Sequence, residues 1–170
     1  MATVTQDIRV VVDKLLRAEK IPTGKARWVD EHRDGDMRLL YPLLMDGELS
    51  DANLQIIAYP RSASLKFRLN LLYGRAIWRL DYVENEEHVN SFNRPDDLVL
   101  GPFTCKHYHA CADNRRFATK SSLPTRLENA RILEGNLQTF ENAFRWFCGQ
   151  TKISISELEI PQLPASDRLL

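Results

Sequence analysis

The chain has 170 residues, of which 44% are hydrophobic and 27% are charged. These values are typical of a single globular domain that is large enough to bury its own core. The 23 basic and 23 acidic side chains cancel, which argues against a protein that coats nucleic acid through overall positive charge. The three cysteines are an odd number at low density, so we expect free thiols in a reducing compartment.

The sequence carries neither a recognisable targeting signal nor a membrane span. Residues Met1 to Gln6 lack a basic segment followed by an apolar run. No apolar stretch approaches the roughly 20 residues that a membrane-spanning helix needs. We therefore expect a cytoplasmic protein that does not enter a membrane.

One predicted helix near the start of the chain is followed by several predicted strands. Apolar residues between Ile8 and Leu16 recur at helical spacing, which predicts an amphipathic helix. Segments rich in β-branched, aromatic and leucine residues then predict strands over residues 27–30, 37–45, 53–59, 64–72 and 75–83. Turn signals at Asp46-Gly47 and Tyr73-Gly74-Arg75 join neighbouring strands, so we expect an antiparallel meander.

The second half of the chain alternates polar loops with two more elements. A polar loop over 84–98 precedes an extended segment around residue 108, and residues 113–125 are again irregular. An apolar helical face predicts a second helix that begins at Asn136 and stops at Gly149. The sequence therefore predicts one α+β domain over residues 1–160, with an antiparallel sheet of about five or six strands flanked by an N-terminal and a C-terminal helix. Residues 161–170 are expected to form an extended tail.

The segment from Cys105 to Cys111 concentrates the reactive side chains. Because side chains alternate along a strand, Cys105, His107, His109 and Cys111 are expected on one face. A strand advances about 3.3 Å per residue, so the two histidines lie about 7 Å apart and the two cysteines about 20 Å apart. The cysteines are too distant to share one ion, which leaves a His-x-His motif with flanking thiols.

This motif is compatible with acid–base chemistry or with metal binding. Cleavage of RNA through its 2′-hydroxyl requires a base, an acid and a cation, and His107, His109 and Arg115 are suitable catalytic groups without a metal or cofactor. The residues expected to bind the substrate beside them are His88, Asn90, Tyr108, Asn114 and Arg116. In the metal alternative, the two histidines are ligands, and His88, Asp113 or a cysteine completes the site.

Local charge is compatible with a nucleic acid or a protein partner. Acidic side chains concentrate over 84–97, and basic side chains follow over 106–131, around the histidines. In a noncatalytic module, these two segments would be docking surfaces for a protein. Arg79 and Asp81 are interpreted as a cross-strand ion pair rather than as site residues.

Several short motifs resemble those of an uncharacterised bacterial family. They are Trp78-Arg79-Leu80-Asp81 at the end of a strand, His88-Val89-Asn90, Gly101-Pro102, His107-Tyr108-His109 and Asn114-Arg115. The resemblance covers roughly residues 65–148 and implies no particular activity. Cys105-Lys106 departs from the family pattern, in which histidine follows Gly-Pro directly.

The histidine arrangement is also similar to that of TumE-like toxins, and this similarity implies RNA as a target. The leading hypothesis is a small, metal-independent RNase of toxin or mobile-element type. One alternative is a noncatalytic protein-binding module of a phage, defence or toxin–antitoxin system. The other is a metal-binding protein that uses the His-x-His motif.

Overall fold

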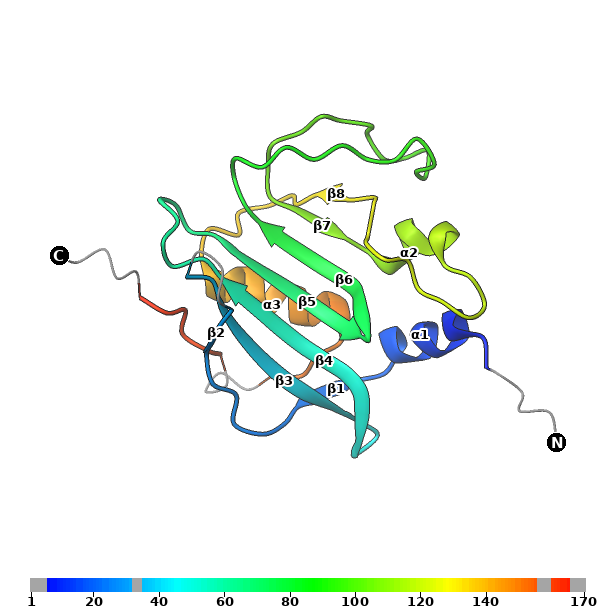
Figure 1. Cartoon of the computed structure of the whole chain (residues 1–170), viewed down its shortest axis with the longest axis horizontal. Coiled ribbons are helices and arrows are strands. Elements are labelled where there is room, and N and C mark those ends of the chain that lie inside the picture. The colour runs from blue at the N-terminus through cyan, green and yellow to red at the C-terminus, as the bar shows by residue number, and fades with distance from the viewer. Residues whose placement is uncertain (1–5, 32–34, 156–159, 166–170) are drawn as a thin grey trace.

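An antiparallel sheet with helices on one face and at one end forms the protein (Figure 1). The computed structural model describes residues 6–31, 35–155 and 160–165. The predicted α+β class is confirmed, and the sheet has eight strands rather than five or six. Among the described residues, no helix is both long and apolar enough to cross a membrane.

Most of the strands follow one another directly along the chain, with few helices between them. In chain order they are α1 (Ile8–Arg17), β1 (Lys20–Pro22), β2 (Val29–Asp30), β3 (Met37–Met45), β4 (Glu48–Ala58), β5 (Phe67–Tyr73), β6 (Arg75–Tyr82), β7 (His107–His109), α2 (Cys111–Asn114), the 3-10 helix η1 (Arg115–Phe117), β8 (Arg131–Ile132) and α3 (Phe140–Thr151). The sheet order is β1-β3-β4-β5-β6-β7-β8, and β2 pairs with β3. Strands β3 to β6 form the predicted meander.

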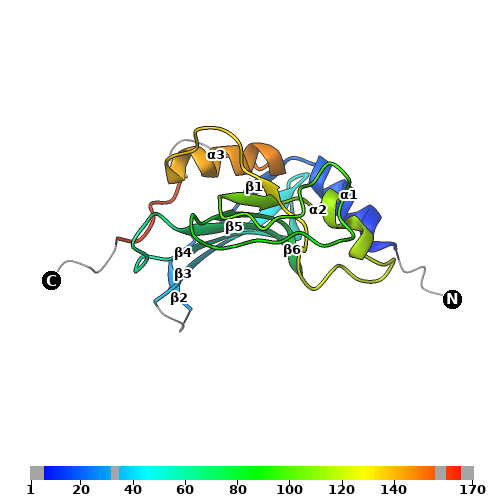
Figure 2. The same cartoon turned by 90° about the horizontal axis from the view of Figure 1, so that it is seen from above.

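Alternation along the strands separates an apolar face of the sheet from a polar one. Leu69 of β5 and Leu80 of β6 are register partners, and neither has exposed surface. On the same face, Trp78 stacks on Tyr108 of β7, and its ring centroid lies 5.2 Å from that of Phe147 of α3. Helix α3 therefore covers the apolar face, as Figure 2 shows, with α1 and α2 at one end of the sheet. The opposite face carries the polar residues that alternate with these.

Two sequence-based boundaries were wrong. Helix α3 begins after Thr139, whose hydroxyl accepts a hydrogen bond from the Asn142 amide at 3.2 Å, rather than at Asn136. The helix continues through Gly149 to Thr151 and ends at Lys152, which adopts a left-handed conformation with φ of 53°. The helix continues because Thr151 is fully buried and its hydroxyl donates to the Phe147 carbonyl, which satisfies both groups within the last turn.

The predicted ribbon from Cys105 to Cys111 was also wrong at its ends. Strand β7 contains only three residues, because its pairing with β6 extends from His107 to His109 and no further. Cys105 lies in a bend before the strand, and Cys111 is the first residue of α2. All three cysteines of the chain are free thiols, as expected.

The predicted tail contacts the domain where it is described. Residues 160–165 have no regular secondary structure, and Leu163 packs against the core. The Gln162 carbonyl accepts a hydrogen bond from the indole nitrogen of Trp28 at 3.0 Å. Residues 166–170 of the predicted tail lie outside the described part of the chain.

A fully buried lysine joins α1 to the edge of the sheet. The ammonium of Lys20 donates to the carbonyls of Leu15 at 2.7 Å and of Ala18 at 2.6 Å, both at the end of α1. These carbonyls have no partner within the helix, and the negative end of the helix dipole favours a cation there. Burial nevertheless lowers the pKa of Lys20 from 10.5 to about 8.

This shift predicts a measurable pH dependence of stability. Between pH 8 and 10.5 the unfolded chain retains a proton that the folded chain has released, so the free energy of unfolding should rise with pH. Lys20→Met should lack this contribution. Urea denaturation from pH 7.5 to 10.5 should therefore show the wild type gaining stability relative to the variant. A difference that stays constant over this range would contradict the assignment.

A candidate histidine site

Strand β7 places both histidines of the His-x-His motif on the polar face of the sheet. His109 pairs in register with Arg79, and His107 pairs with Asp81. The two imidazole centroids are 5.2 Å apart, whereas Tyr108 between them points to the apolar face and stacks on Trp78. The predicted shared face is thus confirmed for the histidines. Both are buried, with exposed fractions of 4% for His107 and 0% for His109.

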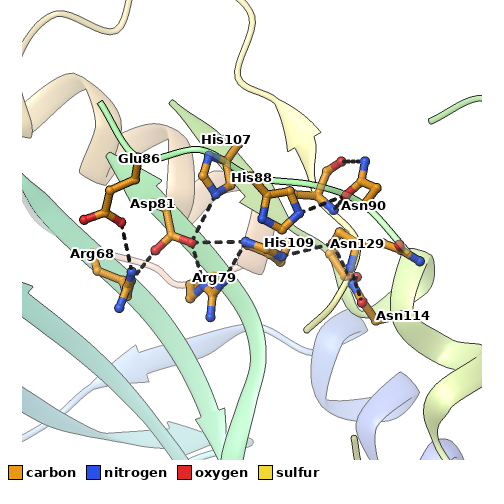
Figure 3. Close-up of polar contacts among 12 residues, drawn as sticks. Arg68, Arg79, Asp81, Glu86, His88, Asn90, His107, His109, Asn114 and Asn129 are labelled. Carbon is orange, nitrogen blue, oxygen red and sulfur yellow. Dashed lines mark hydrogen bonds and ion pairs between the residues drawn. The ribbon is translucent and has the colours of Figure 1, made fainter. Parts of the chain in front are cut away.

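The loop after β6 brings His88 to the two histidines of β7, where it was expected beside them. The ring centroid of His88 lies 4.9 Å from that of His107 and 5.0 Å from that of His109. One ring nitrogen from each of the three histidines lies within 4.8 Å of the others. Figure 3 shows the three imidazoles facing one another. His88 is half-buried, so it forms the most accessible side of the cluster.

A short backbone pairing inside this loop holds His88 in place. The amide of His88 donates to the Phe103 carbonyl at 2.9 Å, and the Phe103 amide donates back at 3.0 Å. Gly101 lies against this pairing with φ of +98°, and a Cβ atom there would approach the His88 carbonyl to 2.9 Å. Glycine is therefore required at this position for the close approach of the two segments.

Asp81 of β6 is the buried anion of the site. Its Oδ2 lies 3.1 Å from Nε2 of His109 and 3.5 Å from Nε2 of His107. The same oxygen lies 2.7 Å from Nε of Arg79, and Oδ1 forms an ion pair with Arg68 from β5. Burial alone would raise the pKa of Asp81, but the guanidinium charges of Arg68 and Arg79 beside it hold the pKa below its ordinary value.

Each of the three imidazoles has one ring nitrogen tied to an oxygen that accepts a hydrogen bond. Nδ1 of His107 contacts the Cys105 carbonyl at 2.8 Å, and Nδ1 of His109 contacts the Asn129 carbonyl at 3.1 Å. Nε2 of His88 contacts Oδ1 of Asn90 at 3.0 Å. Because these oxygens only accept, each of those nitrogens carries a proton. The other nitrogen of His109 lies 2.7 Å from Nη2 of Arg79, which can only donate, so it presents its lone pair.

His88 and His109 are neutral in this arrangement. Burial is the main cause that lowers the pKa of His109, to about 4. Burial also lowers the pKa of His88, and the nearby His107 adds to the effect. Neutral imidazoles with a fixed tautomer can accept a proton or coordinate a metal through the remaining nitrogen.

Three buried asparagines fix the loops around the histidines. Asn90 donates to the carbonyls of Val99 at 2.7 Å and Ala130 at 2.9 Å, and its Oδ1 accepts from the Ala130 amide. Asn114 donates to the Asn129 carbonyl at 2.9 Å and accepts from the Asn129 amide at 2.8 Å. These contacts position the oxygens that orient His88 and His109.

The other predicted site residues lie in different surroundings. Arg115 forms an ion pair with Asp13 of α1, and Arg116 is exposed on η1. Asn90 and Asn114 have 2% and 1% exposure and bind the backbone, so they stabilise the site from within. Asp113, the alternative metal ligand, binds Arg131 through both carboxylate oxygens.

Sequence analysis did not assign Asp81, Arg79 or Asn129 to the site. Asp81 and Arg79 form an ion pair along β6 rather than the cross-strand pair predicted for them, and the cross-strand partner of Asp81 is Arg68 of β5. Alternation along β6 could have placed Asp81 and Arg79 on one face. What the pattern lacked was the register of β7 on β6, which sets His107 opposite Asp81 and His109 opposite Arg79. Asn129 lies 20 residues beyond His109 and contacts it through a backbone carbonyl, which leaves no side-chain signal.

Comparisons with protein-family models, curated proteins and solved structures found no match to the chain. The chemistry of the site is therefore inferred from its own geometry.

The hydrogen bonds predict the tautomer of each histidine. In metal-free protein at pH 7.5, His107 and His109 should carry the proton on Nδ1, and His88 should carry it on Nε2. Long-range ¹H–¹⁵N correlation spectra of labelled protein distinguish the two neutral forms. An Nε2–H tautomer at either His107 or His109 would contradict the arrangement.

Proposed function

We propose that the protein binds a transition-metal ion through His88, His107 and His109. One observation carries this proposal: each imidazole has one nitrogen hydrogen-bonded to a carbonyl-type oxygen, and one nitrogen from each of the three rings belongs to a cluster within 4.8 Å. Histidines that bind metals have this arrangement, since the outer hydrogen bond fixes the tautomer and makes the ligand nitrogen more basic.

The donor set favours ions that prefer imidazole, such as Zn²⁺, Cu²⁺, Ni²⁺ or Fe²⁺, over Mg²⁺ or Ca²⁺. At Zn–N distances of about 2.0–2.1 Å, ligand atoms around a tetrahedral ion lie about 3.3 Å apart. The cluster would contract modestly around such an ion, and His88, on its loop, has the most freedom to move. A bound metal of this kind supplies a Lewis acid and can activate a water molecule near neutral pH.

Metal-independent cleavage of RNA remains the competing proposal, and burial weighs against it. A general acid or base must come within hydrogen-bond reach of the substrate. His109 has no exposed surface, so an RNA substrate does not come within hydrogen-bond reach of its imidazole. Arg115, the cation of that scheme, is paired with Asp13. A noncatalytic docking module would leave this ordered cluster without a chemical role.

Zinc titration tests the metal proposal. The wild type should bind one Zn²⁺ in competition with a chromophoric chelator, and Co²⁺ should give visible absorption bands of an ordered site. Loss of a hydrogen bond to a ligand typically weakens metal binding by about 10–100-fold, so His88→Gln and His107→Gln should weaken it by at least that factor. Cys111→Ser is the matched control, because it removes a nearby thiol that is not in the cluster, and it should bind as the wild type does.

The result that would overturn the metal proposal is a folded wild type that binds neither Zn²⁺ nor Co²⁺, or histidine variants that bind as tightly as the wild type. RNA cleavage assays with and without chelator then separate the competitors. Cleavage that persists in chelator and is lost in His107→Ala would favour acid–base chemistry. Cleavage that needs added metal would make the site a catalytic metal centre.

A further inference from the structure

Arg79 already contributes a positive charge to the histidine cluster. Its Nη2 lies 2.7 Å from Nε2 of His109, and its Nε lies 2.7 Å from Oδ2 of Asp81. In the described part of the chain, Nε of Arg79 is a buried side-chain nitrogen without a hydrogen bond, because the contact with Asp81 lacks suitable geometry. The negative charge of Asp81 holds the guanidinium at a position where its Nε–H lacks a hydrogen-bond acceptor.

The position of the guanidinium follows from the acceptors around it. Nε2 of His109 presents a lone pair, since Nδ1 carries the proton that is donated to Asn129. Oδ2 of Asp81 is also an acceptor, and it lies only 3.1 Å from that nitrogen. Two acceptors at this distance repel each other unless a positive charge lies beside both. Arg79 supplies that charge in the metal-free protein.

We propose that Arg79 is an internal competitor for the metal and sets the affinity of the site. This inference rests on the metal-binding function proposed above. Nε2 of His109 has a single lone pair, which can accept a hydrogen bond from Arg79 or coordinate an ion, but not both. Metal entry therefore displaces the guanidinium from His109.

Electrostatic repulsion also opposes metal binding while Arg79 stays in place. Arg68, Arg79 and Asp81 together carry one net positive charge, so a divalent ion beside them meets unfavourable repulsion while Arg79 stays in place. The side chain of Arg79 is 22% exposed and lies with His109 on the polar face of the sheet, which allows the guanidinium to move into solvent. Arg68 keeps its ion pair with Oδ1 of Asp81.

Displacement of Arg79 also releases Oδ2 of Asp81. This oxygen lies 3.1 and 3.5 Å from Nε2 of His109 and His107. These spacings bracket the value of about 3.3 Å between ligand atoms around tetrahedral zinc. Asp81 lies outside the group of three histidine nitrogens in the metal-free protein, so it becomes the fourth ligand of a His₃Asp centre once the guanidinium has left and His88 has moved toward it.

The test measures Zn²⁺ affinity by chelator competition in Arg79→Gln and Arg79→Met. Removing the competitor should tighten binding by roughly 10- to 100-fold, the equivalent of one hydrogen bond to a charged group. Arg68→Gln is the matched control, because it removes the same charge from the other oxygen of Asp81 without touching His109. It should tighten binding far less than either Arg79 variant.

A second measurement on the wild type covers the case in which the Arg79 variants fail to fold. Zn²⁺ should accelerate solvent exchange of the Arg79 Nε proton, followed in ¹⁵N-labelled protein, as the guanidinium leaves the buried position. Zinc binding with an unchanged Arg79 signal, or with Arg79 variants that bind equally or more weakly, would overturn this inference and leave the metal function standing. Failure of the wild type and the variants alike to bind zinc would overturn both.

Discussion

The buried carboxylate of Asp81 is the constraint on which the arrangement of the site depends. An ionised carboxylate with almost no exposed surface is costly to bury unless charges and hydrogen bonds surround it. Register on the antiparallel sheet supplies those partners directly, because Arg68 of β5 and His107 of β7 lie on either side of Asp81 in the same row. The next row brings Arg79 beside His109. The polar cluster is therefore a product of strand alternation and register.

The apolar face of the same strands provides the stability that such a cluster requires. Leu69, Leu80 and Tyr82 alternate with the charged residues of β5 and β6 and are fully buried under α3. Burial of each such side chain contributes on the order of 1.5–3 kcal/mol, which offsets desolvation on the other face. Every residue of β6 from Ile77 to Tyr82 thus serves either the core or the histidine site.

The sequence predicted the long strands, whose residue types repeat with a regular period. It did not predict the features of the site that depend on single contacts. The meander of β3 to β6 was predictable because long strands show alternation. Strands β1 and β8 have only three and two residues, too few for a period to appear, whereas β2 lies within the strand predicted over residues 27–30. The convergence of His88 on β7 followed from the loop that joins neighbouring strands, whereas the catalytic grouping with Arg115 relied on proximity in sequence alone. Asn129 was invisible because its contribution is a backbone carbonyl.

The loops that complete the site are held by side chains rather than by extended backbone pairing. Asn90 links the loop after β6 to Ala130, and Asn129 links the segment after α2 to Ser91. Buried amides of this kind are costly when any partner is lost, so the two loops should order together or not at all. An ion shared by His88 on one loop and two histidines on β7 would add a direct link between loop and sheet. Metal binding and loop ordering are then coupled, since the free energy of coordination is available only when all three histidines are in place.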